Sequence, residues 1–274
     1  MNAQPLPGNP RASIGGPATP RVRCLLAPNP SAMSLDGTNT WIVAEPGADT
    51  AVVIDPGPDD AGHLRAIVAA VEDEGRRVGR ILLTHGHPDH SAGVAGLKAL
   101  TGAVVHSVDP QWRLGGEGLT DGQVIDDGGL DLRVVATPGH SADSVSFLVA
   151  ADRAVITGDT VLGRGTTVVA YPDGRLGPYL DSLGRLRALA TSGEAAAVLP
   201  AHGPVLDDAG GVLDFYLAHR AARLAQVEAA VAAGDTTAQE VVERVYADVD
   251  RSLWWAAEMS VRAQLEYLTE RAEA

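Results

Sequence analysis

The stretch "RILLTHGHPDHSAG", residues 80–93, contains three histidines and an aspartate within six positions. The apolar run before them is typical of a buried strand, and "SAGVAGL" after them is typical of a helix start. His85 and His87 are two residues apart, so an extended backbone directs both imidazoles to the same side. Asp89 and His90 follow at once, where the strand gives way to the helix. The pattern indicates either a metal site or a polar turn rich in histidine.

Three further strand-like runs decide between these alternatives, because each ends in a residue that can bind a metal ion. His140 follows "VVATPG", Asp159 follows "RAVITG", and His202 follows "AAVLPA". Taken alone, each is more often a solvated polar side chain. Strand ends that meet at one edge would together supply five imidazoles and two carboxylates, a donor set suited to two zinc ions. The sequence therefore predicts a dinuclear site formed by His85, His87, Asp89, His90, His140, Asp159 and His202.

The other three histidines lack this context. His63 and His219 fall on predicted helices, where a surface position is the simpler interpretation, and His106 lies within a strand-like run. We expect none of the three to belong to the site.

Composition limits the classes of partner. The chain has 274 residues and a net charge of −14, with 45% apolar but only 4% aromatic residues. An acidic surface repels nucleic-acid phosphates and anionic membranes, so neither DNA nor a membrane is an expected partner. The single cysteine, Cys24, excludes an internal disulfide framework and a multi-cysteine metal cluster. We expect Cys24 to be a small buried residue of an early strand.

The first twenty residues show no apolar run of the signal-peptide kind and no arginine-rich pattern of a transit peptide. No stretch of the chain approaches the roughly 20 apolar residues of a membrane span. The sequence predicts a disordered tail over residues 1–20 and a cytoplasmic protein.

Residues 21–206 alternate short Val- and Ile-rich runs with Gly, Pro and Asp. The runs predict strands at 21–27, 39–44, 51–55, 80–84, 103–107, 131–137, 145–150, 153–157 and 196–200. Helical patterns lie between some of them, at 59–75, 91–102 and 179–191, the last with Pro178 just ahead as a suitable start. Many strands with interspersed helices favour an α/β sandwich with sheets inside and helices outside.

Residues 207–274 have a different pattern and predict a second, small domain. They contain no strand-like run after residue 210 and are typical of three helices. The second helix follows Thr237, with Glu240 three residues on, which is a capping-box pattern. The predicted organisation is thus a tail at 1–20, an α/β domain at 21–206 and a helical domain at 207–274.

Four of the motifs quoted above, "THGHPDH", "TPGHSADS", "TGDTVLG" and "PAHGP", resemble those of the metallo-β-lactamase-fold hydrolases. The resemblance implies an αββα sandwich that holds two metal ions. It also implies that His85, His87 and His140 bind the first ion. Asp89, His90 and His202 would then bind the second, with Asp159 as the bridge.

A closer resemblance is to the β-lactamase-like protein 2 subfamily, through "NPSAMSLDGTNTWIV", "GDTVLGRGTTVV" and "YLAHRAARLAQ". Members of that subfamily have a small winged-helix-like domain behind the hydrolase domain. Since this sequence stops at "EYLTERAEA", we expect helices without a β-wing.

The predicted site would perform metal-assisted hydrolysis. Two zinc ions and two aspartates leave a positive centre, which lowers the pKa of a bound water to about 7 and yields a metal-bound hydroxide. Asp89 would orient this nucleophile and relay a proton, so it is the candidate catalytic residue. Manganese and iron remain open alternatives to zinc, and both acyl and phosphodiester bonds remain open as targets.

Two substrate classes are left open by the sequence. A small-molecule thioester, ester or lactone suits the acidic surface. An endoribonuclease acting on single-stranded RNA needs a local basic track, for which the tail offers Arg220, Arg223, Arg244, Arg251 and Arg262. We expect no β-lactamase activity, since no export signal is visible. A non-catalytic zinc scaffold is disfavoured because structural zinc sites have four ligands, often cysteines.

Residues that contact the substrate stay unknown at this stage, as does the oligomeric state. Arg164, in a glycine-containing loop at 162–174, could meet an anion, although a connecting loop is an equal alternative. Trp254 and Trp255 could stack on a ring, or pack against the larger domain. His219, Arg220 and Arg223 could face the predicted metal site, but a solvated face of the helix is the favoured interpretation.

Overall fold

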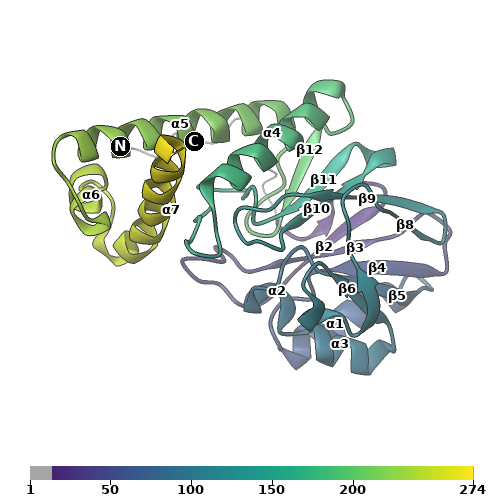
Figure 1. The fold of residues 1–274 in the computed structure, drawn as a ribbon. Coiled ribbons are helices and arrows are strands. Elements are labelled where there is room, and N and C mark those ends of the chain that lie inside the picture. Colours follow the sequence, from purple (N-terminus) through teal and green to yellow (C-terminus); the bar gives the residue numbers. More distant parts are fainter. Residues whose placement is uncertain (1–13, 274) are drawn as a thin grey trace.

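The computed structural model describes residues 14–273 and shows two sheets packed face to face, with helices on both outer faces (Figure 1). This is the predicted αββα sandwich. Most of the expected tail, residues 1–13, lies outside the described residues. The remainder is partly ordered, because β1 (Gly16–Pro17) pairs antiparallel with β2 (Val22–Leu26).

The first sheet has seven strands in sequence order, from β1 to β7. Its first four strands run antiparallel to one another, and β4 to β7 are parallel. The strands after β2 are β3 (Asn39–Val43), β4 (Thr50–Ile54), β5 (Arg77–Leu82), β6 (Val104–Ser107) and β7 (Gly115–Gly118). The sequence did not predict β7, because "GGEG" has no apolar alternation.

The second sheet has five strands in the order β12-β11-β10-β9-β8. Only β11 and β12 are parallel to each other. The strands are β8 (Val124–Asp127), β9 (Leu130–Ala136), β10 (Val145–Val149), β11 (Ala154–Gly158) and β12 (Ala197–Pro200). The central strands β10 and β11 are buried along their whole length, which explains their continuous apolar runs.

Helices cover the outer face of each sheet (Figure 1). On the first sheet lie α1 (Ala61–Glu72) and α3 (Val94–Thr101), and on the second lie α4 (Leu176–Ser192) and part of α5 (Ala209–Ala232). The short α2 (Pro88–Ser91) joins β5 to α3. We expected Pro178 just ahead of α4, but the helix begins at Leu176. Pro178 thus lies in the first turn, where its missing N–H leaves no helical bond unmade.

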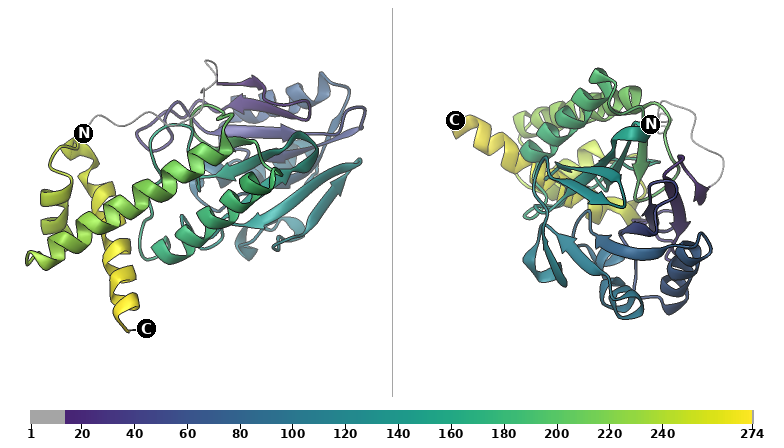
Figure 2. Two further views of the ribbon diagram at one scale, coloured as in Figure 1. Left: turned by 90° about the horizontal axis from the view of Figure 1, so that it is seen from above. Right: turned by 90° about the vertical axis from the view of Figure 1, so that its right-hand side faces the viewer.

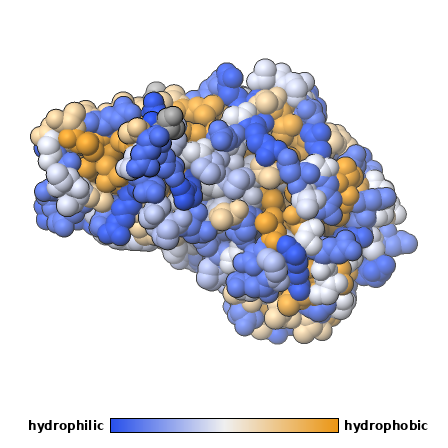
Figure 3. Space-filling model, viewed as in Figure 1, coloured by the Kyte–Doolittle hydropathy of each residue, from blue (hydrophilic) through white to orange (hydrophobic). Residues whose placement is uncertain are grey.

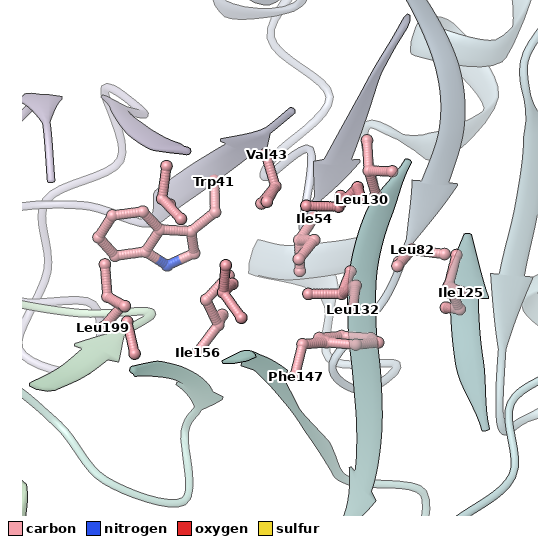
Figure 4. Close-up of a cluster of buried hydrophobic side chains, with 14 of the residues drawn as sticks. Trp41, Val43, Ile54, Leu82, Ile125, Leu130, Leu132, Phe147, Ile156 and Leu199 are labelled. Carbon is pink, nitrogen blue, oxygen red and sulfur yellow. The ribbon is translucent and has the colours of Figure 1, made fainter. Parts of the chain in front are cut away.

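The main core lies between the two sheets and consists largely of aliphatic residues, as the low aromatic content predicted. Trp41 and Ile54 of the first sheet face Ile156 and Leu199 of the second (Figure 4). Cys24 is also buried in this core, as expected. Burial of these apolar side chains between the two sheets fixes the positions of the strands. The loops that follow the strand ends are therefore held in place as well.

The C-terminal part consists of α5, α6 (Ala238–Val245) and α7 (Trp254–Glu273). No strand follows β12 within residues 201–273, so the expected helices without a wing are confirmed for this part of the chain. The predicted capping box is also confirmed, because Thr237 and Glu240 each accept a backbone N–H of the other at the start of α6. In Figure 3, hydrophilic residues follow α7, and a hydrophobic area lies beside α6.

The long helix α5 contributes to two cores. Val212, Leu213 and Tyr216 pack on the second sheet with α4, whereas Val227 and Ala230 pack with α6 and α7. Figure 2 shows α5 extending from the sandwich out to these helices. The division into domains at 21–206 and 207–274 therefore stays a proposal.

Among residues 14–273, no helix combines the length and the apolar character needed to cross a membrane.

Candidate metal centre

Loops from four strand ends bring all seven predicted donors to one edge of the sandwich. His85 and His87 lie between β5 and α2, and Asp89 and His90 lie within α2. The other three follow the second sheet's strands: His140 comes after β9, Asp159 directly after β11 and His202 after β12. The alternation of strand and loop in the sequence thus explains the clustering.

Three histidines form one half of the site. His87 Nδ1 lies 3.0 Å from His85 Nε2 and 3.0 Å from His140 Nε2. These atoms are among the groups that could hold a metal ion.

Asp89, His90 and His202 form the other half, with Asp159 between the halves. His202 Nε2 is 3.2 Å from Asp89 Oδ2 and 3.3 Å from Asp159 Oδ1. His90 Nε2 is 3.6 Å from Asp89 Oδ2 and 3.5 Å from Asp159 Oδ1. The second oxygen of Asp159 is 3.6 Å from His140 Nε2. One carboxylate oxygen therefore faces each half.

The burial and chemistry of the donor atoms suit a metal ion. His90 Nε2 and Asp159 Oδ1 are buried and lack any hydrogen-bond partner. An unpaired buried polar atom is costly unless an ion or water satisfies it. Histidine and carboxylate donors without cysteine suit zinc, manganese or iron.

In four of the five histidines, Nε2 faces the cluster and Nδ1 forms a hydrogen bond on the opposite side of the ring. Nδ1 of His85 bonds Thr84 Oγ1 (3.0 Å), and Nδ1 of His140 bonds the carbonyl of Val168 (2.9 Å). Nδ1 of His202 bonds the Gly37 carbonyl (3.2 Å), and Nδ1 of His90 bonds Asp55 Oδ2 (2.8 Å). Such outer bonds fix the ring orientation and the tautomer of a ligating histidine.

Asp55 adjoins the candidate site, and the sequence did not predict it there. Its side chain is fully buried and accepts hydrogen bonds from Thr84 N (2.8 Å), Thr84 Oγ1 (2.7 Å) and His90. Its φ of 52° is unusual for a residue other than glycine. The available signal was its place at the end of "AVVID", a strand end like the others, but the following Pro-Gly suggested only a turn.

Charges within the cluster oppose one another. Burial lowers the pKa of His85 well below its usual value, and neighbouring histidines add to this, so His85 presents a neutral nitrogen. Burial would also lower the pKa of His90, but Asp159 and Asp55 hold that pKa well above its usual value. Burial would raise the pKa of Asp159, but His202 and His90 keep it well below its usual range. The carboxylates thus attract positive charge to the cluster.

Two of our surface predictions are wrong. His63 is buried and bonds Thr40 Oγ1 (2.9 Å), because α1 packs that face on the first sheet. Arg220 is also buried rather than solvated, since α5 packs it against the loop after Asp159.

Other substrate-contact candidates are engaged elsewhere in the molecule. Arg164 pairs with Asp36 (2.7 Å) on the surface. Trp254 bonds the Val249 carbonyl (3.0 Å) within the C-terminal helices, whereas Trp255 is exposed.

A pocket of about 470 Å³ adjoins the site, with His87 in its wall. Three carboxylates, those of Asp109, Asp143 and Asp173, surround it together with Trp112. Within the described chain, none of the three carboxylates forms an ion pair with an arginine or lysine. The pocket therefore presents negative charge and one aromatic ring beside the histidines.

Two segments of the chain match known protein-family models. Residues 33–202 match the model of the metallo-beta-lactamase superfamily, and residues 237–272 match that of the beta-lactamase associated winged helix domain.

Several fungal proteins are similar in sequence. Lactamase-like protein adaB of Aspergillus niger is 34% identical over 216 residues, which cover 78% of this chain and 64% of that protein. Lactamase-like protein vrtG of Penicillium aethiopicum is 32% identical, covering 86% and 76%. Atrochrysone carboxyl ACP thioesterase of Aspergillus chevalieri is 33% identical, covering 84% and 75%. The chain spans less than two thirds of the length of the first of these relatives.

Solved structures share the fold across nearly the whole chain. A beta-lactamase domain protein from Burkholderia ambifaria has a TM-score of 0.77 at 23% identity, covering 98% of this chain and 92% of its own. A metallo-beta-lactamase family protein from Thermus thermophilus has a TM-score of 0.75 at 22% identity, covering 92% and 94%. With a family model matched over most of its length, this chain belongs to the metallo-beta-lactamase superfamily, and its C-terminal helices match the beta-lactamase associated winged helix domain.

Proposed function

We propose that this chain is a dinuclear, zinc-dependent hydrolase of small-molecule thioesters, esters or lactones. The observation that supports it most is the cluster of seven donors, in which His90 Nε2 and Asp159 Oδ1 are buried without a hydrogen-bond partner. The two groups of histidines, with one Asp159 oxygen facing each, suit two ions. A thioesterase among the relatives favours the acyl class of substrate.

Bound zinc ions would lower the pKa of a water to about 7 and polarise a substrate carbonyl. The two aspartates suit different tasks. The Asp159 side chain is only 14% exposed and is enclosed by His90, His140 and His202, so it is placed to hold ions. The Asp89 side chain is 33% exposed, and His202 Nε2 lies 3.2 Å from its Oδ2. Asp89 can therefore orient the attacking water and pass its proton toward solvent.

Charge favours a small substrate over RNA. Of the arginines that an RNA track would need, Arg244 pairs with Asp235, Arg262 pairs with Glu258, and Arg220 is buried. The pocket beside His87 is surrounded by carboxylates, which would repel a phosphate backbone. The RNA alternative thus has less support than acyl hydrolysis.

The test is a substrate panel on zinc-loaded protein. An N-acetylcysteamine thioester, an acyl lactone, a chromogenic β-lactam and a labelled single-stranded RNA would be compared for the parent and Asp89→Asn, which preserves the shape of the side chain. We expect thioester or lactone hydrolysis, with kcat lower by roughly 10²–10⁴ in the variant. Cleavage of RNA alone, abolished by Asp89→Asn, would replace this proposal with the nuclease. Turnover that Asp89→Asn leaves intact would overturn the catalytic role given to Asp89.

A further inference from the structure

The loop at residues 159–168 connects the two halves of the candidate centre, yet it contains no helix or strand. Asp159 is its first residue. Near its end, the Val168 carbonyl accepts the hydrogen bond of His140 Nδ1 (2.9 Å). The conformation of this loop therefore sets the direction of two of the seven donors.

Side chains from α4 and α5 satisfy the loop's backbone. Tyr179 donates to the Thr160 carbonyl (2.7 Å). Tyr216 accepts from the Leu162 N–H (2.8 Å) and donates to the Gly165 carbonyl (3.3 Å). Arg220 Nη2 donates to the Thr167 carbonyl. Buried backbone groups need such partners, so these side chains replace the missing secondary structure.

Arg220 stands out among them because it is a buried charge. Arg220 is only 7% exposed, and it forms no ion pair within residues 14–273. Its guanidinium lies over the Tyr179 ring, 4.9 Å from the ring centroid. Burial of a cation without a carboxylate partner is costly. An arginine here is thus a poor choice if the only need were to pack α5.

Thr167, whose carbonyl accepts the hydrogen bond of Arg220, is linked to the candidate centre in two ways. The Thr167 peptide, whose carbonyl Arg220 holds, leads directly to Val168 and so to His140. Thr167 Oγ1 donates to the backbone carbonyl of Asp159 (2.6 Å). Movement at Thr167 would therefore displace both Asp159 and the hydrogen-bond acceptor of His140.

We propose that Arg220 is a positioning residue for the metal centre, by which the C-terminal helices fix the loop that orients Asp159 and His140. The inference depends on the proposed metal-dependent function. It assigns to α5 a role in the site that is distinct from covering a substrate or binding RNA.

The experiment compares Arg220→Met and Arg220→Lys with Arg223→Met in the full chain. Arg223 is a matched control, because it lies on the same helix but bonds the Val245 carbonyl (3.3 Å) and covers the Tyr246 ring, away from the loop. Each protein is titrated with zinc against a chromogenic chelator. The Co²⁺-loaded form is examined by visible absorption, which reports the ligand geometry. Thermal unfolding of the metal-free proteins measures stability separately.

We expect Arg220→Met to weaken zinc binding roughly tenfold and to change the Co²⁺ spectrum, as outer residues of metal sites do. Arg220→Lys should recover part of the affinity, since its ammonium still donates to a carbonyl. Arg223→Met should match the parent in both metal readouts. If Arg220→Met does not fold, the Arg220→Lys spectrum and affinity decide the outcome.

Parent-like zinc affinity and Co²⁺ spectra in both Arg220 variants, with only a lower unfolding temperature, would overturn the inference and leave the proposed function standing. A parent protein that binds neither ion would overturn both.

Discussion

At the scale of single residues, the donors were predictable because they follow apolar runs, either near strand ends or, for Asp89 and His90, in the short helix α2 that follows β5. Asp55 has the same placement, but one aspartate before Pro-Gly gives no sequence signal beyond a turn. Arg220 could not be predicted, because its role depends on a loop more than fifty residues earlier in the chain. His63 was wrongly predicted to lie on the surface, because only the packing of α1 in the folded chain shows which face of that helix is buried.

Asp55→Asn should weaken zinc binding roughly 10–100-fold with little change in the fold. Asparagine tolerates the positive φ at this position, but its amide cannot accept from Thr84 and His90 with both atoms. Zinc titration and circular dichroism measure the two effects. Asp60→Asn is the control, because Asp60 caps α1 and asparagine caps helices equally well. Equal zinc affinity in the two variants would contradict the role given to Asp55.

Cys24 should resist thiol reagents in the folded protein. Burial raises its pKa to about 12, so at pH 8 the thiol is both protonated and inaccessible. A disulfide reagent such as DTNB should label less than a tenth of the protein over the minutes in which it labels the guanidinium-unfolded chain fully. Rapid full labelling without denaturant would show that β2 opens readily.

At the scale of helices and strands, elements with a strong apolar period were predicted closely, and elements without one were not. β10 was expected at 145–150 and spans Val145–Val149. The sequence did not predict β7 or β8, because β7 has no apolar residue and β8 has only Val124 and Ile125, too few to show a period. The four residues of α2 were too few for any period to show.

Thr237→Ala should loosen α6 without disturbing the sandwich. The variant loses the hydrogen bond from the Glu240 N–H to Thr237 Oγ1 (3.2 Å), and a cap of this kind contributes about 1 kcal/mol. Amide exchange in α6 should become roughly fivefold faster, while β10 and β11 exchange as in the parent. Thr236→Ala leaves this cap in place and is the matched control. Unchanged exchange in α6 would mean that packing on α5 and α7 alone holds the helix.

At the scale of the whole molecule, the order of strands and helices predicted an α/β sandwich with helices outside, the family resemblance implied the αββα form, and the comparisons confirm it. The sequence could not show that α5 packs in two cores. Its apolar stripe continues along the helix, and nothing in the pattern marks where one partner ends and the other begins.

Removal of metal should lower the unfolding temperature of the whole chain. Asp55, Asp89 and Asp159 lie in one cluster, and an ion that binds only the folded state adds about 2.7 kcal/mol at a hundredfold excess over its Kd. For a chain of this size, we expect zinc to raise the Tm by roughly 5–11 °C over the chelated protein. Asp159→Asn should abolish most of this difference. A Tm insensitive to both chelator and zinc would argue against a resident ion.

The helix α5 also determines where the C-terminal part of this protein could be exchanged for that of another protein. A graft joined at residue 206 would discard Val212, Leu213, Tyr216 and Arg220, and so strip the second sheet of part of its cover. A junction between Arg223 and Val227 keeps those residues and replaces only the outer turns, where the helix meets α6 and α7. Chimaeras with a foreign C-terminal module should therefore fold when they inherit the first half of α5, and aggregate when they do not.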